Sequence, residues 1–288
     1  MDKVTYDVKA QDLVHKIVAK SLPYKPTLYD TAWVSMLSQP HNENITDLAF
    51  PESFDFLLNH QQANRSWSTC DSEEDAILNT LAATLSIQRR CSRLSPDHED
   101  FLAVLKARVS KAVTFLRTYM TVWKPEAGTH DTFEILAPAL LEMLEHEGTT
   151  IEFPGRASLM ALNKARFLDF DAQTLCGTER TPMLYFLEAF AGLVVCEKLK
   201  KHTVSGAIMQ SPASTAAYLM GLEIWDKDSE AYLRHAIQAA GNTGGVPAVF
   251  PYNTLETAIV GEILHNLHRG CSTYIQTGHR DSDREWLF

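Results

Sequence analysis

The sequence predicts an all-α protein, and three observations support this fold class. Apolar residues recur at helical spacing in most periodic segments. Helix-start patterns precede several of these segments. A serine stands before a proline at 95–96 and at 211–212, and Ser72 stands three residues before Asp75 in a capping-box pattern. No run alternates clearly between apolar and polar residues, so few strands are expected.

The expected helices follow one another along the chain with short proline-containing turns between them. Their approximate positions are 10–22, 75–87, 101–116, 133–144, 181–190, 211–220 and 255–267. The apolar residues of 78–85, 133–141 and 217–222 are expected on the inner layer of helix hairpins, with polar residues on the opposite faces. Periodicity alone leaves a helical bundle, a solenoid and an α/α barrel equally open.

Composition narrows the possible partners and the compartment. The 288 residues carry a formal net charge of −10 and have no Lys/Arg run, so nucleic acid is not an expected partner. The five cysteines are scattered without a CxxC pattern, as is usual for reduced thiols. No signal peptide and no apolar run of about 20 residues is evident, so the expected location is cytoplasmic, without a membrane span.

Several motifs occur in an order that resembles a known enzyme family. YDTAWVSML begins at Tyr29, SPASTAAYLM at Ser211 and GGVPAVFP at Gly244. Between them, a segment with Trp67 resembles the family's Q-x-x-DGSWG, with Asn-Arg in place of Asp-Gly, and Trp67 is expected to be a packing aromatic. The chain resembles the N-terminal part of fungal bifunctional copalyl diphosphate/ent-kaurene synthases, which are labdane-type, class II diterpene cyclases. The resemblance implies an α/α half-barrel of antiparallel helix hairpins, of the type called the γ domain.

The same resemblance implies domain limits. Residues 1–27 would hold an N-terminal segment with the first helix of the β domain, 28–270 the γ-like domain, and 271–288 a divergent tail. The DxDD motif that supplies the family's catalytic acid does not occur in these residues, nor does the DDxxD of the α domain. Asp281 and Asp283 lie in the tail, but Arg284 occupies the fourth position of that pattern.

Candidate site residues also come from the resemblance. Tyr185 stands where ent-copalyl diphosphate synthases have a base histidine, and Ala248 where they have its asparagine partner. Neither side chain repeats that dyad, and a phenol is a poor base at neutral pH. Glu126 and Asp131 lie in the stretch that aligns with an acidic cluster, which in relatives helps to bind Mg²⁺ and the diphosphate. Mg²⁺ is therefore the implied cofactor.

Two functional hypotheses follow from these residues. In the first, the chain is a piece of a class II cyclase that acts on geranylgeranyl diphosphate, or another prenyl diphosphate, only when completed by a β domain. In the second, it is a non-catalytic helical helper or pseudoenzyme, and an exposed apolar face would then favour self-association. The first hypothesis predicts that the chain alone does not cyclise geranylgeranyl diphosphate.

Overall fold

The computed structural model describes residues 24–38, 48–68, 72–123 and 131–251. Residues Tyr24–Phe250 form one compact unit. The expected helices at 10–22 and 255–267 and the tail at 271–288 lie outside the described residues. The domain limits given above stay predictions.

Helices dominate the described residues, as the sequence predicts. The α-helices are α2 (Leu28–Ser35), α3 (Pro51–Asn59), α4 (Glu73–Arg93), α5 (Glu99–Val122), α6 (Asp131–His146), α7 (Arg156–Arg166), α8 (Pro212–Met220) and α9 (Lys227–Ala239). The 3₁₀ helices are η1 (Pro96–His98), η2 (Ala172–Cys176), η3 (Pro182–Phe190) and η4 (Cys196–His202). Two short antiparallel strands, β1 (Thr203–Val204) and β2 (Ala207–Ile208), complete the set.

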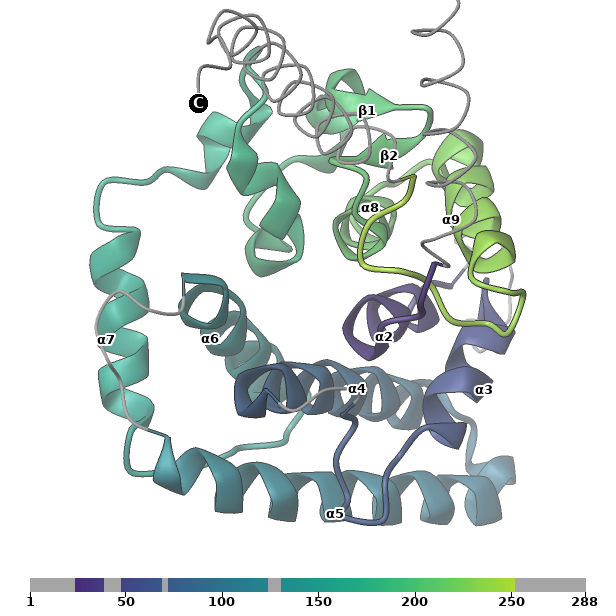
Figure 1. Cartoon of the computed structure of the whole chain (residues 1–288), viewed down its shortest axis with the longest axis vertical. Helices are drawn as coiled ribbons and strands as arrows, with labels where there is room; N and C mark the ends of the chain where they lie inside the picture. The colour runs from purple at the N-terminus through teal and green to yellow at the C-terminus, as the bar shows by residue number, and fades with distance from the viewer. Residues whose placement is uncertain (1–23, 39–47, 69–71, 124–130, 252–288) are drawn as a thin grey trace, which may run out of the picture. The chain divides into compact units, whose positions relative to one another are not determined.

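The helices form two layers (Figure 1). In the inner layer α2 contacts α4, α4 contacts α6, α6 contacts η3, η3 contacts α8, and α8 returns to α2. The outer layer places α3 on α2, α5 on α4, α7 on α6, η2 on η3 and α9 on α8. Each inner helix thus has an outer helix packed on it, which is the arrangement of an α/α barrel. Among the described residues, the inner ring is closed.

The inner helices are buried on more sides than the sequence predicts. The apolar residues of 78–85 and 133–141 lie in the core, but α4 is buried continuously from Ala76 to Ile87 and α8 from Pro212 to Leu219. The polar residues of these stretches, such as Asn79 and Thr84, are therefore buried too, because an inner helix is covered by its outer partner as well as by its inner neighbours. Buried hydroxyls bond instead to the backbone one turn earlier, as Thr80 Oγ1 does to the Ala76 carbonyl at 2.6 Å.

Serine caps begin several of these helices. Ser211 Oγ accepts the backbone N–H of Ser214 at 3.1 Å and starts α8, with Pro212 in the first helical position. Ser72 Oγ accepts the N–H of Asp75 at 3.3 Å and starts α4. Each cap satisfies a donor that the helix itself leaves unpaired. The start patterns in the sequence are confirmed at both helices.

The turn before Trp67 keeps the backbone that glycine would favour. Arg65 has a φ of 79°, in the left-handed region, at the position where the resembling motif has glycine. The Asn64 side chain stabilises the turn by accepting from the N–H of Ser66 at 3.1 Å and from its hydroxyl at 2.7 Å. Trp67 itself is fully buried, and its Nε1–H donates to the Leu57 carbonyl at 2.7 Å. Trp67 is thus a packing aromatic, as expected.

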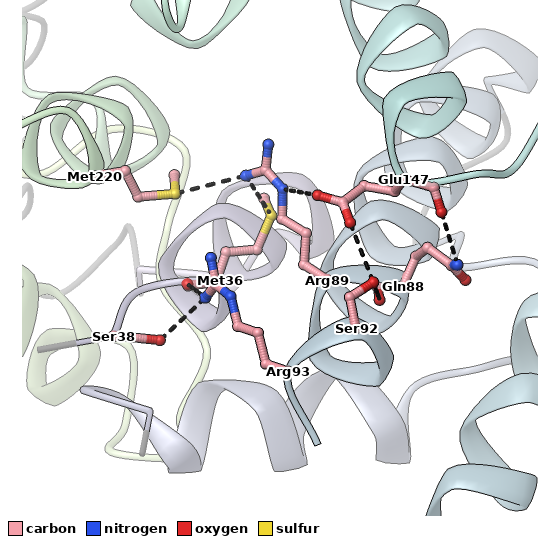
Figure 2. Close-up of polar contacts among 8 residues, drawn as sticks. All are labelled: Met36, Ser38, Gln88, Arg89, Ser92, Arg93, Glu147 and Met220. Atoms are coloured by element: carbon pink, nitrogen blue, oxygen red, sulfur yellow. Dashed lines mark hydrogen bonds and ion pairs between the residues drawn. The ribbon is translucent and has the colours of Figure 1, made fainter. Parts of the chain in front are cut away.

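At the end of the barrel where the inner helices finish, one arginine joins several of them (Figure 2). Arg89 of α4 lies with Nη1 3.5 Å from the sulfur of Met36, after α2, and 3.7 Å from that of Met220, at the end of α8. Its Nε donates to Glu147, directly after α6, at 3.3 Å. Arg93 donates toward the end of α2, to the Met36 carbonyl and to Ser38 Oγ. This end of the ring is therefore held together by Arg89.

Candidate functional site

A cavity of about 290 Å³ lies at the other end of the barrel, where the inner helices begin. Its lining includes the first turns of α2, α4 and α6, the middle of η3, and the serine that caps α8. The lining residues are Thr27, Tyr29, Asp30, Asp75, Leu78, Asn79, Thr132, Leu136, Tyr185, Phe186, Glu188, Ser211 and Ala248. Since helix N-termini carry partial positive charge, their convergence favours negative or electron-rich groups at this end.

Tyr185 and Ala248, which stand at the positions of the family's dyad, line this same cavity although they are far apart in the sequence. The turn that carries Ala248 is fixed to the start of α2. Thr27 N–H donates to the Val246 carbonyl at 2.8 Å, and the Val246 N–H donates to Thr31 Oγ1 at 3.0 Å. This bridge places the turn that carries Ala248 beside the start of α2, at the cavity.

Tyr185 reaches the cavity from η3. Thr181 caps this helix by accepting the N–H of Met183 at 3.3 Å, and Pro182 occupies its first position. The helix is kinked at Phe186, which has φ −115° and ψ 30°. Tyr185 and Glu188 stand three residues apart across this kink, and both line the cavity.

Two carboxyl groups are buried in the cavity wall. Glu188 accepts from the hydroxyl of Tyr29 at 3.2 Å and lies 2.9 Å from Ser214 Oγ. Asp30 accepts from Thr27 Oγ1 at 2.7 Å and from the N–H of Ala213 at 3.3 Å. Burial raises the pKa of both groups to about 7. It also raises the pKa of Tyr29, with the charge of Glu188 adding to the effect.

The predicted metal residues do not enter this arrangement. Glu126 lies outside the described residues, and of Asp131 only its place as the first residue of α6 is described. Across the described ranges, no group of three or more His, Cys, Asp or Glu side chains could hold a metal ion. The carboxyls of Asp30 and Glu188 are occupied by neutral hydrogen-bond partners. The described residues therefore do not by themselves show where a metal ion would be held.

Sequence reasoning missed Asp30, Tyr29 and Glu188 as cavity residues. Tyr29 and Asp30 are the first two letters of YDTAW, and Glu188 lies in the same helix as Tyr185. All three lie in segments that the motifs single out. A stretch of mixed polarity does not reveal which acid is buried, because that depends on contacts with α8 and η3.

Comparisons with known proteins agree with this fold. No protein-family model matches the sequence. The chain is 42% identical over 238 residues to the copalyl diphosphate synthase of Talaromyces verruculosus, covering 81% of this chain and 24% of that protein. It is 35% identical over 250 residues to the ent-kaur-16-ene synthase of Fusarium fujikuroi, with 82% and 25% covered. The chain thus spans about a quarter of the length of the curated relatives it matches.

Solved structures give the same result. Abietadiene synthase from Abies grandis is 25% identical and superposes with a TM-score of 0.65, covering 85% of this chain and 32% of that one. The ent-copalyl diphosphate synthase of Arabidopsis thaliana, at 24% identity, shares the fold with a TM-score of 0.66, covering 91% and 38%. Of the helices described, none is long and apolar enough to cross a membrane. In sequence and in fold, the chain is related to the diterpene cyclases of the fungal copalyl diphosphate and ent-kaurene synthase type.

Proposed function

We propose that this chain forms the γ-type helical domain of a class II diterpene cyclase. The substrate would be geranylgeranyl diphosphate, and the product a copalyl-type diphosphate formed by protonation of the terminal alkene. The relatives named above are a copalyl diphosphate synthase and an ent-kaur-16-ene synthase, and each is matched over about four fifths of this chain. The observation that carries the proposal is the cavity, because Tyr185 and Ala248, the positions of the base dyad in the resembling enzymes, both line it.

The catalytic acid would come from a segment other than these 288 residues. Protonating an alkene needs a strong acid, whereas Glu188 and Asp30, with pKa values near 7, are weaker acids than ordinary carboxyls. The DxDD pattern of the resembling enzymes does not occur in the sequence. The described cavity would then be one wall of the reaction site, and it would act after the protonation step.

Tyr185 would take part in ending the reaction. A carbocation intermediate is quenched when a neighbouring C–H bond gives its electron pair to a new double bond and its proton to a base. A phenol is a weak base, so it suits the proton of a strongly acidic carbocation but no ordinary proton abstraction. Tyr185→Phe should therefore change the product distribution more than it lowers substrate binding.

A chimaera tests the proposal. The 238-residue matching segment of the Talaromyces verruculosus enzyme is replaced by that of this chain, and the purified protein is incubated with geranylgeranyl diphosphate and Mg²⁺. After phosphatase treatment, gas chromatography–mass spectrometry should detect a bicyclic alcohol. This chain alone should give no product above a boiled control. A folded chimaera that yields none, while the parent enzyme does, would refute the proposal.

The dependence on Mg²⁺ stays a proposal drawn from the resemblance. Asp131 begins α6 immediately before Thr132, which lines the cavity. Replacing Asp131 with asparagine in the chimaera should raise the Mg²⁺ concentration needed for half-maximal activity. Asp97→Asn, on the exposed η1, is the matched control. An unchanged Mg²⁺ dependence in Asp131→Asn would remove Asp131 from the metal hypothesis.

The alternative is a non-catalytic helical helper that associates with itself or with another chain. Leu168 and Leu193 favour it, because their side chains are 74% and 61% exposed. Leu193 also lines a second, largely apolar cavity of about 210 Å³ with Phe167, Phe170 and Phe190. Sedimentation of the purified chain distinguishes the two: a dimer that Leu193→Ser converts to a monomer would support association through this face.

A further inference from the structure

One hydroxyl joins Glu188 to the backbone of Tyr185. Ser214 Oγ, on α8, lies 2.7 Å from the carbonyl oxygen of Tyr185 and 2.9 Å from Glu188 Oε2. Tyr29 donates to the other oxygen, Oε1, at 3.2 Å. Ser214 is completely buried, and Glu188 is only 2% exposed. Water is therefore a poor substitute for any of these partners.

The number of hydrogens in this group limits the charge of Glu188. A serine hydroxyl has one hydrogen, and a backbone carbonyl can only accept. If Ser214 donates to Tyr185 at the shorter distance, its contact with Glu188 needs a hydrogen from Glu188. With an ionised Glu188, one hydrogen would have to serve two acceptors, and one buried oxygen would lose most of its bond. A protonated Glu188 satisfies every contact: Oε2–H donates to Ser214, which donates to Tyr185.

The surroundings of Glu188 favour the neutral form as well. The titratable groups that line the cavity with it are Asp30 and Tyr29 of α2, Asp75 of α4 and Tyr185 of η3. No Lys, Arg or His is among the lining residues. The buried phenol of Tyr232, on α9, lies within electrostatic range of Asp30 and Tyr185. Burial of Glu188, with the nearby charge of Asp30, raises the pKa of its carboxyl to about 7.

We propose that Glu188 is held as a neutral carboxylic acid and is a positioning residue for Tyr185, acting through Ser214. The chain of hydrogen bonds runs from the cavity wall at α2 to α8 and back to η3, across the kink at Phe186. A neutral acid also keeps an anionic carboxylate out of a cavity in which a carbocation would otherwise be captured. The significance of Tyr185 rests on the proposed function, but the protonation state and the coupling do not.

Substitution by glutamine distinguishes the neutral from the ionised form. Glutamine at position 188 can donate from Nε2 to Ser214 and accept from Tyr29 at Oε1, which reproduces the neutral acid. Glu188→Gln should therefore unfold at nearly the same urea concentration as the wild type. Glu188→Leu, of similar volume, should unfold at a clearly lower concentration, because it leaves the buried Tyr29 hydroxyl without its acceptor and Ser214 without its donor. In infrared difference spectra at about pH 6, wild type minus Glu188→Gln should contain the C=O band of a protonated carboxylic acid.

The coupling to Tyr185 is measured on the full chain labelled with 3-fluorotyrosine. The ¹⁹F resonance of Tyr185 is the one lost in Tyr185→Phe. In the wild type it should shift with a midpoint near pH 7, as Glu188 titrates. In Glu188→Gln and in Ser214→Ala that shift should be absent, while Asp30→Asn should retain it.

Two results would overturn the proposal. One is an infrared difference spectrum without the acid band, and the other is a Tyr185 shift that persists unchanged in Glu188→Gln. Neither measurement uses cyclase activity. An inactive chimaera together with a coupled Tyr185 would refute only the proposed function, and the reverse pattern would refute only this inference.

Discussion

The carboxyl of Asp30, at the start of the barrel, accepts hydrogen bonds from two neutral donors, the Thr27 hydroxyl and the Ala213 N–H. Burial raises its pKa to about 7. The folded chain therefore binds this proton more tightly than the unfolded chain, in which the pKa is about 4. The contribution to stability is complete below about pH 4 and is lost as the pH rises towards about 7.

Asp30→Asn should reduce this loss. Between about pH 5 and about pH 8, the free energy of unfolding of the wild type should fall by about 2 to 4 kcal/mol more than that of Asp30→Asn. Urea unfolding across this range measures the difference. Asp97→Asn, on the exposed η1, should keep the wild-type profile. Identical profiles for the wild type and Asp30→Asn would show that Asp30 is ionised in the folded chain.

Trp67 offers a second prediction at this scale. Trp67→Phe leaves the buried Leu57 carbonyl without its donor and creates a cavity, so it should cost about 2 to 4 kcal/mol in unfolding free energy. Trp225→Phe is the control, because Trp225 is half-buried and donates to Glu230 at 2.7 Å near the surface. It should cost about 1 kcal/mol. Equal losses would mean that the buried bond of Trp67 adds nothing.

The cavity residues show which parts of the candidate site could be predicted from the sequence. The resemblance led to Tyr185 and Ala248, and the structure brings both to one cavity. It did not lead to Glu188 or Asp30 as buried acids. Their burial is decided by α8, whose Ser214 and Ala213 stand opposite them. Contacts between segments separated by more than a hundred residues, such as Asp30 with Ala213, leave no periodic pattern in the sequence.

At the scale of elements, capping residues predicted the helix starts, whereas apolar periodicity did not predict helix type or the burial of polar residues. Serine before proline at 211–212, and serine three residues before Asp75, predicted helix starts that the structure confirms. η3 was expected as a helix and is a kinked 3₁₀ helix, which a stretch of apolar residues does not distinguish from an α-helix. The burial of the polar residues of the inner helices was not predicted, because periodicity does not show whether a second layer covers a helix.

The turn before Trp67 gives a prediction for an element. The left-handed backbone at Arg65 is strained for a residue with a side chain, whereas glycine adopts it without strain. Relief of this strain in Arg65→Gly should therefore stabilise the chain by about 0.5 to 1 kcal/mol. The higher conformational entropy of glycine in the unfolded state reduces this gain. Gly148→Ala is the reverse test: Gly148 has a φ of 82° with no neighbouring atom within 4 Å, so only backbone strain is added. Thermal unfolding should move in opposite directions for the two variants. A destabilised Arg65→Gly would point to an unnoticed role of the arginine side chain.

At the scale of the whole unit, the closed ring decides where chemistry can occur. Helices α2, α4 and α6 begin at the cavity and the serine cap of α8 lies in its wall, so this end of the barrel brings together Asp30, Glu188 and Tyr185. At the other end, the Arg89 side chain contacts the ends of α2 and α8 and the residue after α6 (Figure 2), and so links three parts of the ring. This closure needs contacts between α2 and α8, which periodicity alone does not predict.

Arg89→Met tests this closure while keeping most of the side-chain volume. It removes the charge beside Glu147 and the donors to two sulfurs, so it should lower the unfolding free energy by about 1 to 3 kcal/mol. Hydrogen exchange should become faster at the C-terminal ends of both α2 and α8, because Arg89 contacts both. Arg93→Met is the matched control: Arg93 donates hydrogen bonds to Met36 and Ser38, so exchange should rise at the end of α2 and stay unchanged at α8. If α8 exchanges equally in the two variants, Arg89 is a surface residue without a role in closing the ring, and packing between α2 and α8 holds the barrel by itself.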